Sequence, residues 1–421
     1  MSDVIDELHW RGLIAQDSGL DEIRSALAAG PVTFYCGFDP TAPSLHHGHL
    51  VQLIMMRHLQ LAGHNPIALV GGATGLIGDP REKGERILNS RETVAGWVER
   101  LQNQISRFLD FDGPHAARMV NNLDWTSQLD AIEFLRDLGK HFRMGTMLAK
   151  DTVARRLKSE EGISYTEFSY QILQAYDYLQ LHREYGCTLE TGGNDQWGNL
   201  VGGMDLIRKV TGDTVHVMTT PLMVKSDGTK FGKSEGGAIW LDPEMMSPYA
   251  FYQFWLSTED ADVIRFLKVF TFRSRSDIEH LEHLTAEQPH LRAAQKALAE
   301  DVTRFVHGDA ATDAVLAATS ALWGGGDLRA VSGETLAQAT EQLPSSDLVP
   351  GVTTILDLLV DTGLESSRKA ARRTVESGGA YLNNEKVSGV DQVITETDLL
   401  PGGLVLIRRG RRNLAVSRVT K

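Results

Sequence analysis

Cysteine and long apolar runs are both scarce in this 421-residue sequence. Its two cysteines, Cys36 and Cys187, are too few for a disulfide framework or a cysteine-rich zinc site, which indicates a reducing compartment. No apolar run approaches the roughly 18 residues that a membrane-spanning helix requires, so we expect no membrane attachment. Residues 1–7 are acidic and lack the hydrophobic centre of a signal peptide, and we therefore expect a cytoplasmic protein.

Positive charge is also in short supply, with 42 Lys and Arg against 55 Asp and Glu, a net charge of -13. That balance alone argues against a nucleic-acid partner, but the charge is unevenly distributed. Residues 352–421 hold 11 Lys and Arg and 8 Asp and Glu, a net +3, so the rest of the chain carries -16. A basic tail favours nucleic acid as its partner, with a mildly basic surface as the alternative. The length gives room for two or three domains.

The rest of the chain is organised around residues 35–50. A short apolar strand ends there, turns through a loop with two prolines, and leads into a helix after Gly48. A strand followed by a helix N-terminus presents free backbone N–H groups and the positive end of a helix dipole, which favours phosphate. His46 and His49 can then face one anion, and Gly48 lets a flat base approach the backbone. Taken alone, a His-x-x-His pattern is more often two ordinary histidines.

A second motif, residues 230–234, favours a phosphate-binding interpretation of the first. Lys230 and Lys233 could fold over a triphosphate and neutralise charge on a leaving pyrophosphate. Together the two motifs resemble the HIGH and KMSKS signatures of class I aminoacyl-tRNA synthetases, with His47 in place of Ile and Phe231-Gly232 in place of Met-Ser. The Lys-Phe-Gly-Lys variant resembles the tyrosyl-tRNA synthetases of bacterial type, and the resemblance covers nearly the whole chain.

One predicted helix, with no Lys or Glu between residues 167 and 184, carries a polar stripe. Tyr170, Gln174 and Asp177 fall at i, i+4 and i+7 and line one face. The alternative is the outer face of an amphipathic helix, but a buried stripe would require partners. Tyr170 and Gln174 could hold an ammonium group, while Asp177 and Tyr35 hold a phenolic hydroxyl. Phenylalanine would leave Asp177 and Tyr35 unpaired, so such a site would reject it.

Further residues complete the expected tyrosine site. Asp79 follows a buried apolar strand and a glycine-rich turn, where it could bind an ammonium group or simply start a turn before Pro80. Gln196 is positioned for the amino-acid carboxylate. It lies in residues 192–199, a run that closely matches the family. In the same run Gly193 and Asp195 could approach a ribose, although Asp195 could equally cap a helix.

The resemblance implies the nucleotide contacts. Thr41, His46 and His49 would hold the outer phosphates and the adenine side. Lys83 and Arg86, by default a solvated face, would contact pyrophosphate transiently. The other residues assigned to the nucleotide are Cys36, Gly37, Asp39, Gly48, Gly193, Asp195 and Lys233. Cys36 has an alternative as a small buried hydrophobic residue.

The predicted fold class is α/β, a Rossmann-like parallel-sheet nucleotide-binding domain followed by an α-helical domain and a small α+β RNA-binding domain. The helical insert would carry the homodimer interface, and the last domain resembles a ribosomal small-subunit protein. The expected ranges are 1–222 for the catalytic domain with its insert at about 120–160, 223–246 for a mobile lysine loop, 247–323 for a helical anticodon-binding domain, 324–350 for a weakly packed linker containing a short helix, and 351–421 for the RNA-binding domain.

Several basic residues are candidates for tRNA contact. The resemblance suggests that Arg155, in a cluster with Arg156, meets the acceptor arm and that Arg208 and Lys209 lie near the discriminator base, with solvated or helix-capping roles as the alternatives. The helix of the tail domain would present a basic edge to phosphates through Arg368, Lys369, Arg372 and Arg373.

These features predict a tyrosine--tRNA ligase that uses L-tyrosine, ATP and tRNA(Tyr), with Mg²⁺ accompanying ATP and no fixed protein metal site. One alternative is an enzyme of the same class that charges tryptophan or adenylates another small acid. Asp177 opposite Tyr35 favours a phenol over an indole. A second alternative is a catalytically idle RNA-binding protein, against which the presence of both lysines and both histidines argues. Amino-acid-dependent ATP–pyrophosphate exchange separates all three.

Overall fold

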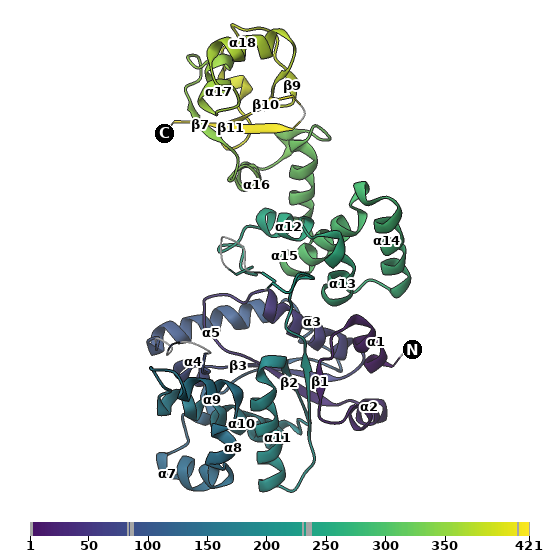
Figure 1. Cartoon of the computed structure of the whole chain (residues 1–421), viewed down its shortest axis with the longest axis vertical. Coiled ribbons are helices and arrows are strands. Elements are labelled where there is room, and N and C mark those ends of the chain that lie inside the picture. The colour runs from purple at the N-terminus through teal and green to yellow at the C-terminus, as the bar shows by residue number, and fades with distance from the viewer. Residues whose placement is uncertain are drawn as a thin grey trace. The chain divides into compact units, whose positions relative to one another are not determined.

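The computed structural model describes residues 3–81, 84, 88–229, 231–232, 238–410 and 412–420 (Figure 1). The chain divides into two compact units. The first comprises Met1–Met245 and Thr258–Leu298, and the second comprises Met246–Ser257 and Ala299–Lys421. Within the described residues, no helix has both the length and the apolar character needed to cross a bilayer.

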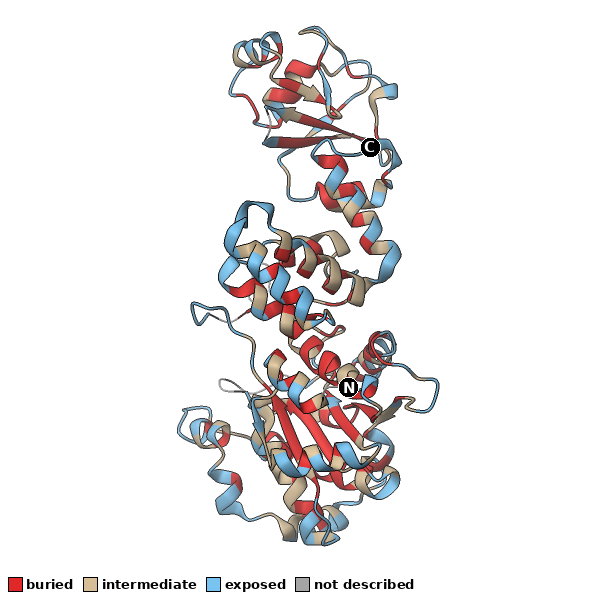
Figure 2. Cartoon of the chain, turned by 90° about the vertical axis from the view of Figure 1, so that its right-hand side faces the viewer, coloured by how far each residue is buried: buried red, intermediate tan, exposed pale blue. Residues whose placement is uncertain are grey.

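A six-stranded sheet forms the centre of the first unit, and the strands are ordered β1-β6-β5-β2-β3-β4. Every neighbouring pair is parallel except β1 with β6. Figure 2 shows the middle of this sheet as largely buried, and its strands β2 and β3 are mostly apolar for that reason. The strands are β1 (Gln16–Asp17), β2 (Thr33–Phe38), β3 (Asn65–Val70), β4 (Arg118–Asn121), β5 (Leu189–Gly193) and β6 (His216–Thr220). The predicted parallel α/β sheet is confirmed.

The strand order reverses at β2, because β3 extends the sheet on one side and β5 on the other. A ligand cleft is expected at such a point, outside the carboxyl ends of the strands. Figure 1 shows α3 and α5 on one side of this sheet and α10 and α11 on the other. The helices of this unit are α1 (Val4–Arg11), α2 (Leu20–Ala29), α3 (His47–Leu61), α4 (Thr74–Ile77), α5 (Arg91–Ile105), α6 (Leu123–Thr126), α7 (Ala131–Glu133), α8 (Met144–Leu148), α9 (Asp151–Leu157), α10 (Tyr165–Tyr185), α11 (Trp197–Val210), α13 (Asp260–Phe270) and α14 (Arg275–Glu287).

The longest helix along the cleft, α10, has clear start and stop signals. The Ser164 hydroxyl accepts from the Glu167 N–H at its start, and Gly186 ends it in the left-handed conformation at φ 62°. The insert before it, expected to be helical at about 120–160, consists of short helical pieces. Asp130 caps a new helix, and a π-turn (Phe134–Leu138) and Gly139 interrupt it.

The second unit contains a five-stranded sheet ordered β7-β11-β10-β8-β9. Helices α17 and α18 pack on it through a core that includes Ile355, Leu358, Ala371, Val405 and Ile407. The elements are α12 (Pro248–Leu256), α15 (Ala293–Leu322, which contains the boundary between the units), α16 (Gly333–Ala339), α17 (Ile355–Asp361), α18 (Arg368–Glu376), β7 (Ser345–Leu348), β8 (Ala380–Leu382), β9 (Glu385–Lys386), β10 (Leu404–Arg409) and β11 (Asn413–Val419).

Residues 324–350 are better ordered than the weakly packed connection expected from their composition. Their apolar side chains Leu328, Val331 and Leu336 are buried in a core shared with β10 and β11. Strand β7 pairs in parallel with β11, from Ser345 against Val416 to Leu348 against Val419. The polar residues of this segment concealed its packing, because only a few apolar positions and one edge strand hold it in place.

Candidate active site

One cavity of about 380 Å³ opens at the carboxyl ends of β2 and β5. It brings together every residue predicted for tyrosine binding, along with most of those predicted for the nucleotide. The predicted residues that line it are Tyr35, Cys36, Gly37, Asp39, Thr41, His46, Gly48, His49, Asp79, Tyr170, Gln174, Asp177, Gly193, Asp195 and Gln196. Lys83, Arg86, Lys230 and Lys233 lie outside the described residues.

A buried carboxylate, Asp177, and a buried hydroxyl, Tyr35, both line this cavity. Asp177 Oδ2 accepts from Asn122 Nδ2 at 2.9 Å, and its Oδ1 accepts from Trp125 Nε1 at 2.8 Å. Burial raises the pKa of Asp177 to about 7, while these two donors oppose the rise. The Tyr35 hydroxyl has no partner of good hydrogen-bond geometry among the described residues. Asp177 and Tyr35 therefore retain the capacity to bind one further polar group.

A second polar cluster lies where the substrate ammonium group was expected. The Tyr170 hydroxyl donates to Asp39 Oδ2 at 2.7 Å, and the Thr74 hydroxyl donates to Asp39 Oδ1 at 2.6 Å. With its proton committed to Asp39, the Tyr170 oxygen is left as an acceptor. Asp39 was assigned to the nucleotide from the sequence, and the structure couples it to Tyr170 as well.

Asp79 is held in place by two amides. Its Oδ2 accepts from Gln196 Nε2 at 3.0 Å, and its Oδ1 accepts from Asn199 Nδ2 at 3.4 Å. Behind them Lys150 Nζ donates to Asn199 Oδ1 at 3.2 Å. Burial lowers the pKa of Lys150 to about 8, while the charge of Asp79 opposes the fall. Lys150, on the short turn before α9, gave no signal in the sequence.

The two histidines lie at the start of helix α3, and a backbone N–H group fixes the tautomer of each ring. Gly48 N–H donates to His46 Nδ1 at 3.0 Å, and His46 N–H donates to His49 Nδ1 at 3.2 Å, a reciprocal capping box. Their rings stack at 4.0 Å between centroids. Burial lowers the pKa of His46 and places that of His49 well below its ordinary value, so both rings are neutral at pH 7. With each Nδ1 accepting, the proton of each ring is on Nε2.

Gly48 has a structural role besides the one expected from the sequence, which was that its missing side chain lets a base lie on the backbone. A Cβ built at Gly48 would stand 2.9 Å from Cε1 of the His46 ring, so the glycine also makes room for the imidazole that caps its own N–H. Gly48 still lines the cavity, and its nucleotide role stays a prediction.

The departures from the two family signatures meet in space. Phe231 packs edge-on against His47, with ring centroids 5.3 Å apart. A Cβ at Gly232, where φ is 77°, would stand 2.1 Å from His47 Cε1. The imidazole thus occupies the space that a side chain at position 232 would need. The imidazole of His47 therefore fits because residue 232 is glycine and has no side chain.

Comparisons with known proteins agree with this geometry. Residues 27–324 match the family of tRNA synthetases class I (W and Y), and residues 335–416 match the tyrosine--tRNA ligase SYY-like C-terminal domain. The chain belongs to the class I tRNA synthetases, in the tyrosine--tRNA ligase family. The predicted relationship is thereby confirmed.

Relatives of this family resemble the chain over most or all of its length. It is 60% identical over 421 residues to the tyrosine--tRNA ligase of Streptomyces coelicolor, with 100% of both chains covered. It is 54% identical over 414 residues to that of Corynebacterium glutamicum, with 98% of both covered. A C-terminally truncated mitochondrial tyrosyl-tRNA synthetase of Aspergillus nidulans superposes with a TM-score of 0.68 at 31% identity, covering 75% of this chain and 92% of that structure.

The basic residues expected to contact tRNA lie away from the cavity. Arg155, Arg208 and Lys209 are exposed. Arg208 pairs with Asp205 at 2.9 Å, and Lys209 Nζ donates to the His141 carbonyl at 3.0 Å. Arg155 Nε donates to the Asp151 carbonyl at 3.3 Å, and the contact of these three residues with tRNA stays a prediction.

Arg156 is expected from the sequence to share the solvated or tRNA-facing role of Arg155, and that expectation is wrong. Its side chain is 1% exposed and pairs with Glu167 at 2.9 Å. It also donates to the carbonyls of Arg81, Gly84 and Gly162. A buried guanidinium needs this many acceptors, and breaking such a pair typically costs about 3–5 kcal/mol of stability.

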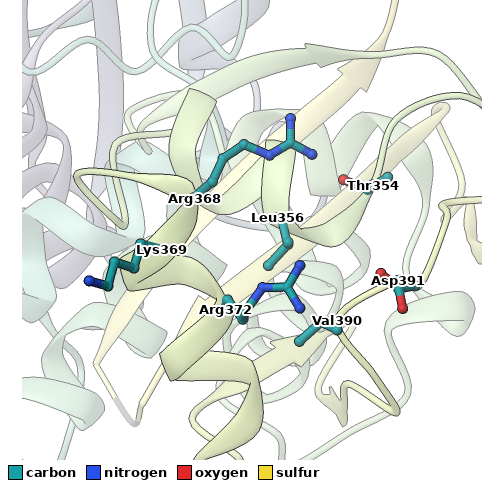
Figure 3. A pocket seen from close by; sticks show the side chains of 7 residues that line it. All are labelled: Thr354, Leu356, Arg368, Lys369, Arg372, Val390 and Asp391. Atoms are coloured by element: carbon teal, nitrogen blue, oxygen red, sulfur yellow. The ribbon is translucent and has the colours of Figure 1, made fainter.

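In the second unit, α18 presents the predicted basic edge. Arg368, Lys369, Arg372 and Arg373 are all exposed, and all but Arg373 line a cavity of about 340 Å³. Figure 3 shows the Arg372 guanidinium pointing toward Val390 and Asp391, while Lys369 points away from them. Arg368 is partly neutralised by Asp357, 2.8 Å away.

Proposed function

We propose that the protein is a tyrosine--tRNA ligase that forms tyrosyl-adenylate and pyrophosphate from L-tyrosine and ATP. The tyrosyl group then passes to the 3′-terminal ribose of tRNA(Tyr). The observation that carries this proposal is that Asp177 and Tyr35 line the same cavity as His46 and His49. One cavity thus offers partners for a phenol together with donors for phosphate. Family membership and the full-length similarity to tyrosine--tRNA ligases support the same reaction.

The residues give a consistent placement for tyrosine. Its phenolic hydroxyl would donate to Asp177 and accept from Tyr35. Its ammonium group would meet the Tyr170 oxygen and the carboxylate of Asp79, which Gln196 holds in place. Because the Tyr170 proton is committed to Asp39, the hydroxyl oxygen can only accept, which suits an ammonium group.

The chemistry needs no covalent catalyst from the protein. The tyrosine carboxylate attacks the α-phosphorus of ATP, and the bond to pyrophosphate breaks. The protein supplies positioning and stabilises charge on the leaving group. We propose that Nε2–H groups of His46 and His49 donate to the phosphates, with Thr41, Lys230 and Lys233 beside them. Cys36, Gly37, Gly193 and Asp195 would hold the nucleoside, and Lys83 and Arg86 would meet pyrophosphate.

Magnesium is proposed only as a companion of ATP. Among the described residues, no group of three or more His, Cys, Asp or Glu side chains is arranged to hold a metal ion. A fixed protein ligand for Mg²⁺ is not part of the proposal. The proposed location is the cytoplasm, where tRNA and ATP are available.

The function is tested by ATP–pyrophosphate exchange with each of the twenty amino acids. Tyrosine alone is expected to support exchange. Phenylalanine should be rejected by about 10⁴–10⁵, a ratio taken over from what is known of tyrosyl-tRNA synthetases themselves. Exchange with tryptophan in place of tyrosine, or with no amino acid at all, would contradict the proposal.

We also propose a homodimer that uses the insert at about 120–160. Several large apolar side chains are exposed there, including Ile132 at 66%, Leu135 at 56% and Met144 at 58%. Isolated exposed apolar residues are ordinary, but a group on one segment marks an interface. Sedimentation should give twice the chain mass, and Ile132→Asp with Leu135→Asp should shift it to one chain. A monomer before substitution would contradict this.

The domain roles stay as proposed from the sequence: a catalytic domain at 1–222, the lysine loop at 223–246, anticodon recognition at 247–323 and RNA binding at 351–421. Acceptor-end contacts are assigned to Arg155, Arg208 and Lys209.

Replacing Arg372 with alanine is expected to weaken tRNA binding by about fivefold to tenfold, because a guanidinium that contacts phosphate adds affinity without reading sequence. The salt dependence of binding should become shallower by about one unit of slope. Exchange without tRNA should not change. Glu376→Ala at the end of the same helix is the matched control, and equal losses in the two variants would refute the assignment.

A further inference from the structure

Glu190 is a buried carboxyl group that the proposed reaction has so far left without a role. It lies on β5, is 2% exposed, and lines the candidate active-site cavity. Its Oε1 accepts a long hydrogen bond from Gln174 Nε2 at 3.4 Å. Among the described residues, Glu190 Oε2, the Tyr35 hydroxyl and Gln174 Oε1 have no partner of good geometry. Three buried polar atoms with unused capacity thus gather in one cavity, and such atoms are normally paired in the working protein.

The surroundings of Glu190 disfavour a negative charge. The Tyr35 hydroxyl and the Gln174 amide favour the ionised form, but burial outweighs them, the charge of Asp177 opposes ionisation as well, and none of the three groups is a cation. On its other side, a Cβ at Gly203 of α11 would lie 3.4 Å from Oε2, so the carboxyl is closely packed. Burial raises the pKa of Glu190 to about 8. The neighbouring thiol of Cys36 stays protonated as well, because burial raises its pKa to about 12.

Asp177 competes with Glu190 for one negative charge. The charge of Asp177 raises the pKa of Glu190, so the carboxyl group with the better donors ionises first. Asp177 accepts two hydrogen bonds of good geometry, at 2.9 and 2.8 Å. Glu190 accepts one long hydrogen bond from Gln174, and the Tyr35 hydroxyl acts on it without good hydrogen-bond geometry. At neutral pH the charge therefore belongs on Asp177 and the proton on Glu190.

If Glu190 carries a proton, each polar group around the substrate phenol has one consistent set of hydrogen bonds. Charged Asp177 takes the single hydrogen of the substrate phenol. The phenol oxygen then needs a donor, which is the Tyr35 hydroxyl. Tyr35 Oη is thereby free to accept from the protonated Oε2 of Glu190. The other oxygen of Glu190 accepts from Gln174 Nε2, which would leave Gln174 Oε1 to accept from the substrate ammonium.

We infer that Glu190 is a positioning residue for tyrosine selection, a neutral acid that orients the Tyr35 hydroxyl and the Gln174 amide toward the substrate. This inference rests on the proposed function. An ionised Glu190 would take the Tyr35 proton for itself, and the phenol would lose its donor. Tyrosine affinity should therefore fall as the pH rises through the range in which Glu190 loses its proton.

The test measures KM and kcat for tyrosine in ATP–pyrophosphate exchange between about pH 6.5 and about pH 9. Glu190→Gln keeps a donor and cannot ionise, so its KM should match the unaltered protein at pH 7. At about pH 9 the unaltered protein should have a KM about tenfold above that of Glu190→Gln. Ionisation of free tyrosine affects both proteins equally and cancels in this ratio. Glu190→Met removes the donor and should raise KM about tenfold at pH 7, with a smaller change in kcat.

Tyr178→Phe is the matched control. Its hydroxyl donates to the His216 carbonyl at 2.8 Å and its ring packs on Tyr35, so it disturbs the same cluster without facing the substrate. Its KM should keep the pH dependence of the unaltered protein. Coinciding pH profiles for the unaltered protein and Glu190→Gln, or equal damage at pH 7 in Glu190→Gln and Glu190→Met, would overturn the inference alone. Absence of tyrosine-dependent exchange in the unaltered protein would overturn the proposed function and this inference with it.

Discussion

Replacing His46 with asparagine is expected to slow tyrosyl-adenylate formation by about 10²–10³-fold, with tyrosine affinity unchanged within about twofold. The imidazole uses its Nδ1 for the Gly48 N–H, so only its Nε2–H is available to the phosphates. That donor matters most as charge develops on the leaving pyrophosphate, and less when tyrosine alone is bound. The measurement is single-turnover adenylate formation, with tyrosine binding followed separately by equilibrium dialysis.

Asparagine is chosen because it separates catalysis from folding. His46 is the N-cap of α3, and asparagine is among the best N-cap residues, so the helix start should survive. His46→Ala would lose the cap as well, at a cost of about 1 kcal/mol. Lys233→Ala should resemble His46→Asn in its kinetics. Equal losses in adenylate formation and tyrosine affinity, in either variant, would show that the assigned role is wrong.

The sequence predicted those features that depend on periodicity and strand ends. Tyr170, Gln174 and Asp177 share a face because of the helical repeat, and a parallel sheet brings β2, which holds Tyr35, and the segment that leads from β3 to Asp79 to one edge. The helical repeat depends only on nearby residues, and the meeting of strand ends follows from the parallel sheet. The whole predicted tyrosine site therefore came together in one cavity.

Residues that act through long-range partners could not be predicted in the same way. Asn122 and Trp125 reach Asp177 from the segment after β4, and no spacing in the sequence links them to it. Arg156 is buried because Glu167 and three backbone carbonyls surround it, while its neighbour Arg155 stays exposed. Glu190 left one usable signal, since a carboxylate inside an otherwise buried strand requires a reason.

Replacing Asp177 with asparagine is expected to weaken tyrosine binding by about 10–100-fold, because a hydrogen bond to a charged group contributes about 1.5–3 kcal/mol. Phenylalanine has no hydroxyl to lose, so its weak binding should hardly change. The preference for tyrosine over phenylalanine should fall by the same factor as tyrosine affinity. The measurement is kcat/KM for both amino acids in ATP–pyrophosphate exchange.

The pH dependence gives a second readout of the same variant. Asp177, whose pKa burial raises to about 7, accepts the phenol well only when ionised. In the unaltered protein, tyrosine affinity should therefore fall as the pH drops below about 7, and this acid limb should be absent from Asp177→Asn. Tyr35→Phe is the matched control. It removes the other partner of the phenol, should cost about fivefold in affinity, and should keep the acid limb.

The free energy of unfolding of Asp177→Asn separates two roles of this carboxylate, which are binding the substrate phenol and accepting hydrogen bonds from Asn122 and Trp125. Asn122 and Trp125 each donate to one of its oxygens, and an asparagine offers a single oxygen, so one donor will face an NH₂ group. The free energy of unfolding should drop by about 1–3 kcal/mol, a change seen without any substrate present. If the variant loses that stability but discriminates between tyrosine and phenylalanine as before, Asp177 only braces Asn122 and Trp125, and the phenol binds elsewhere in the cavity.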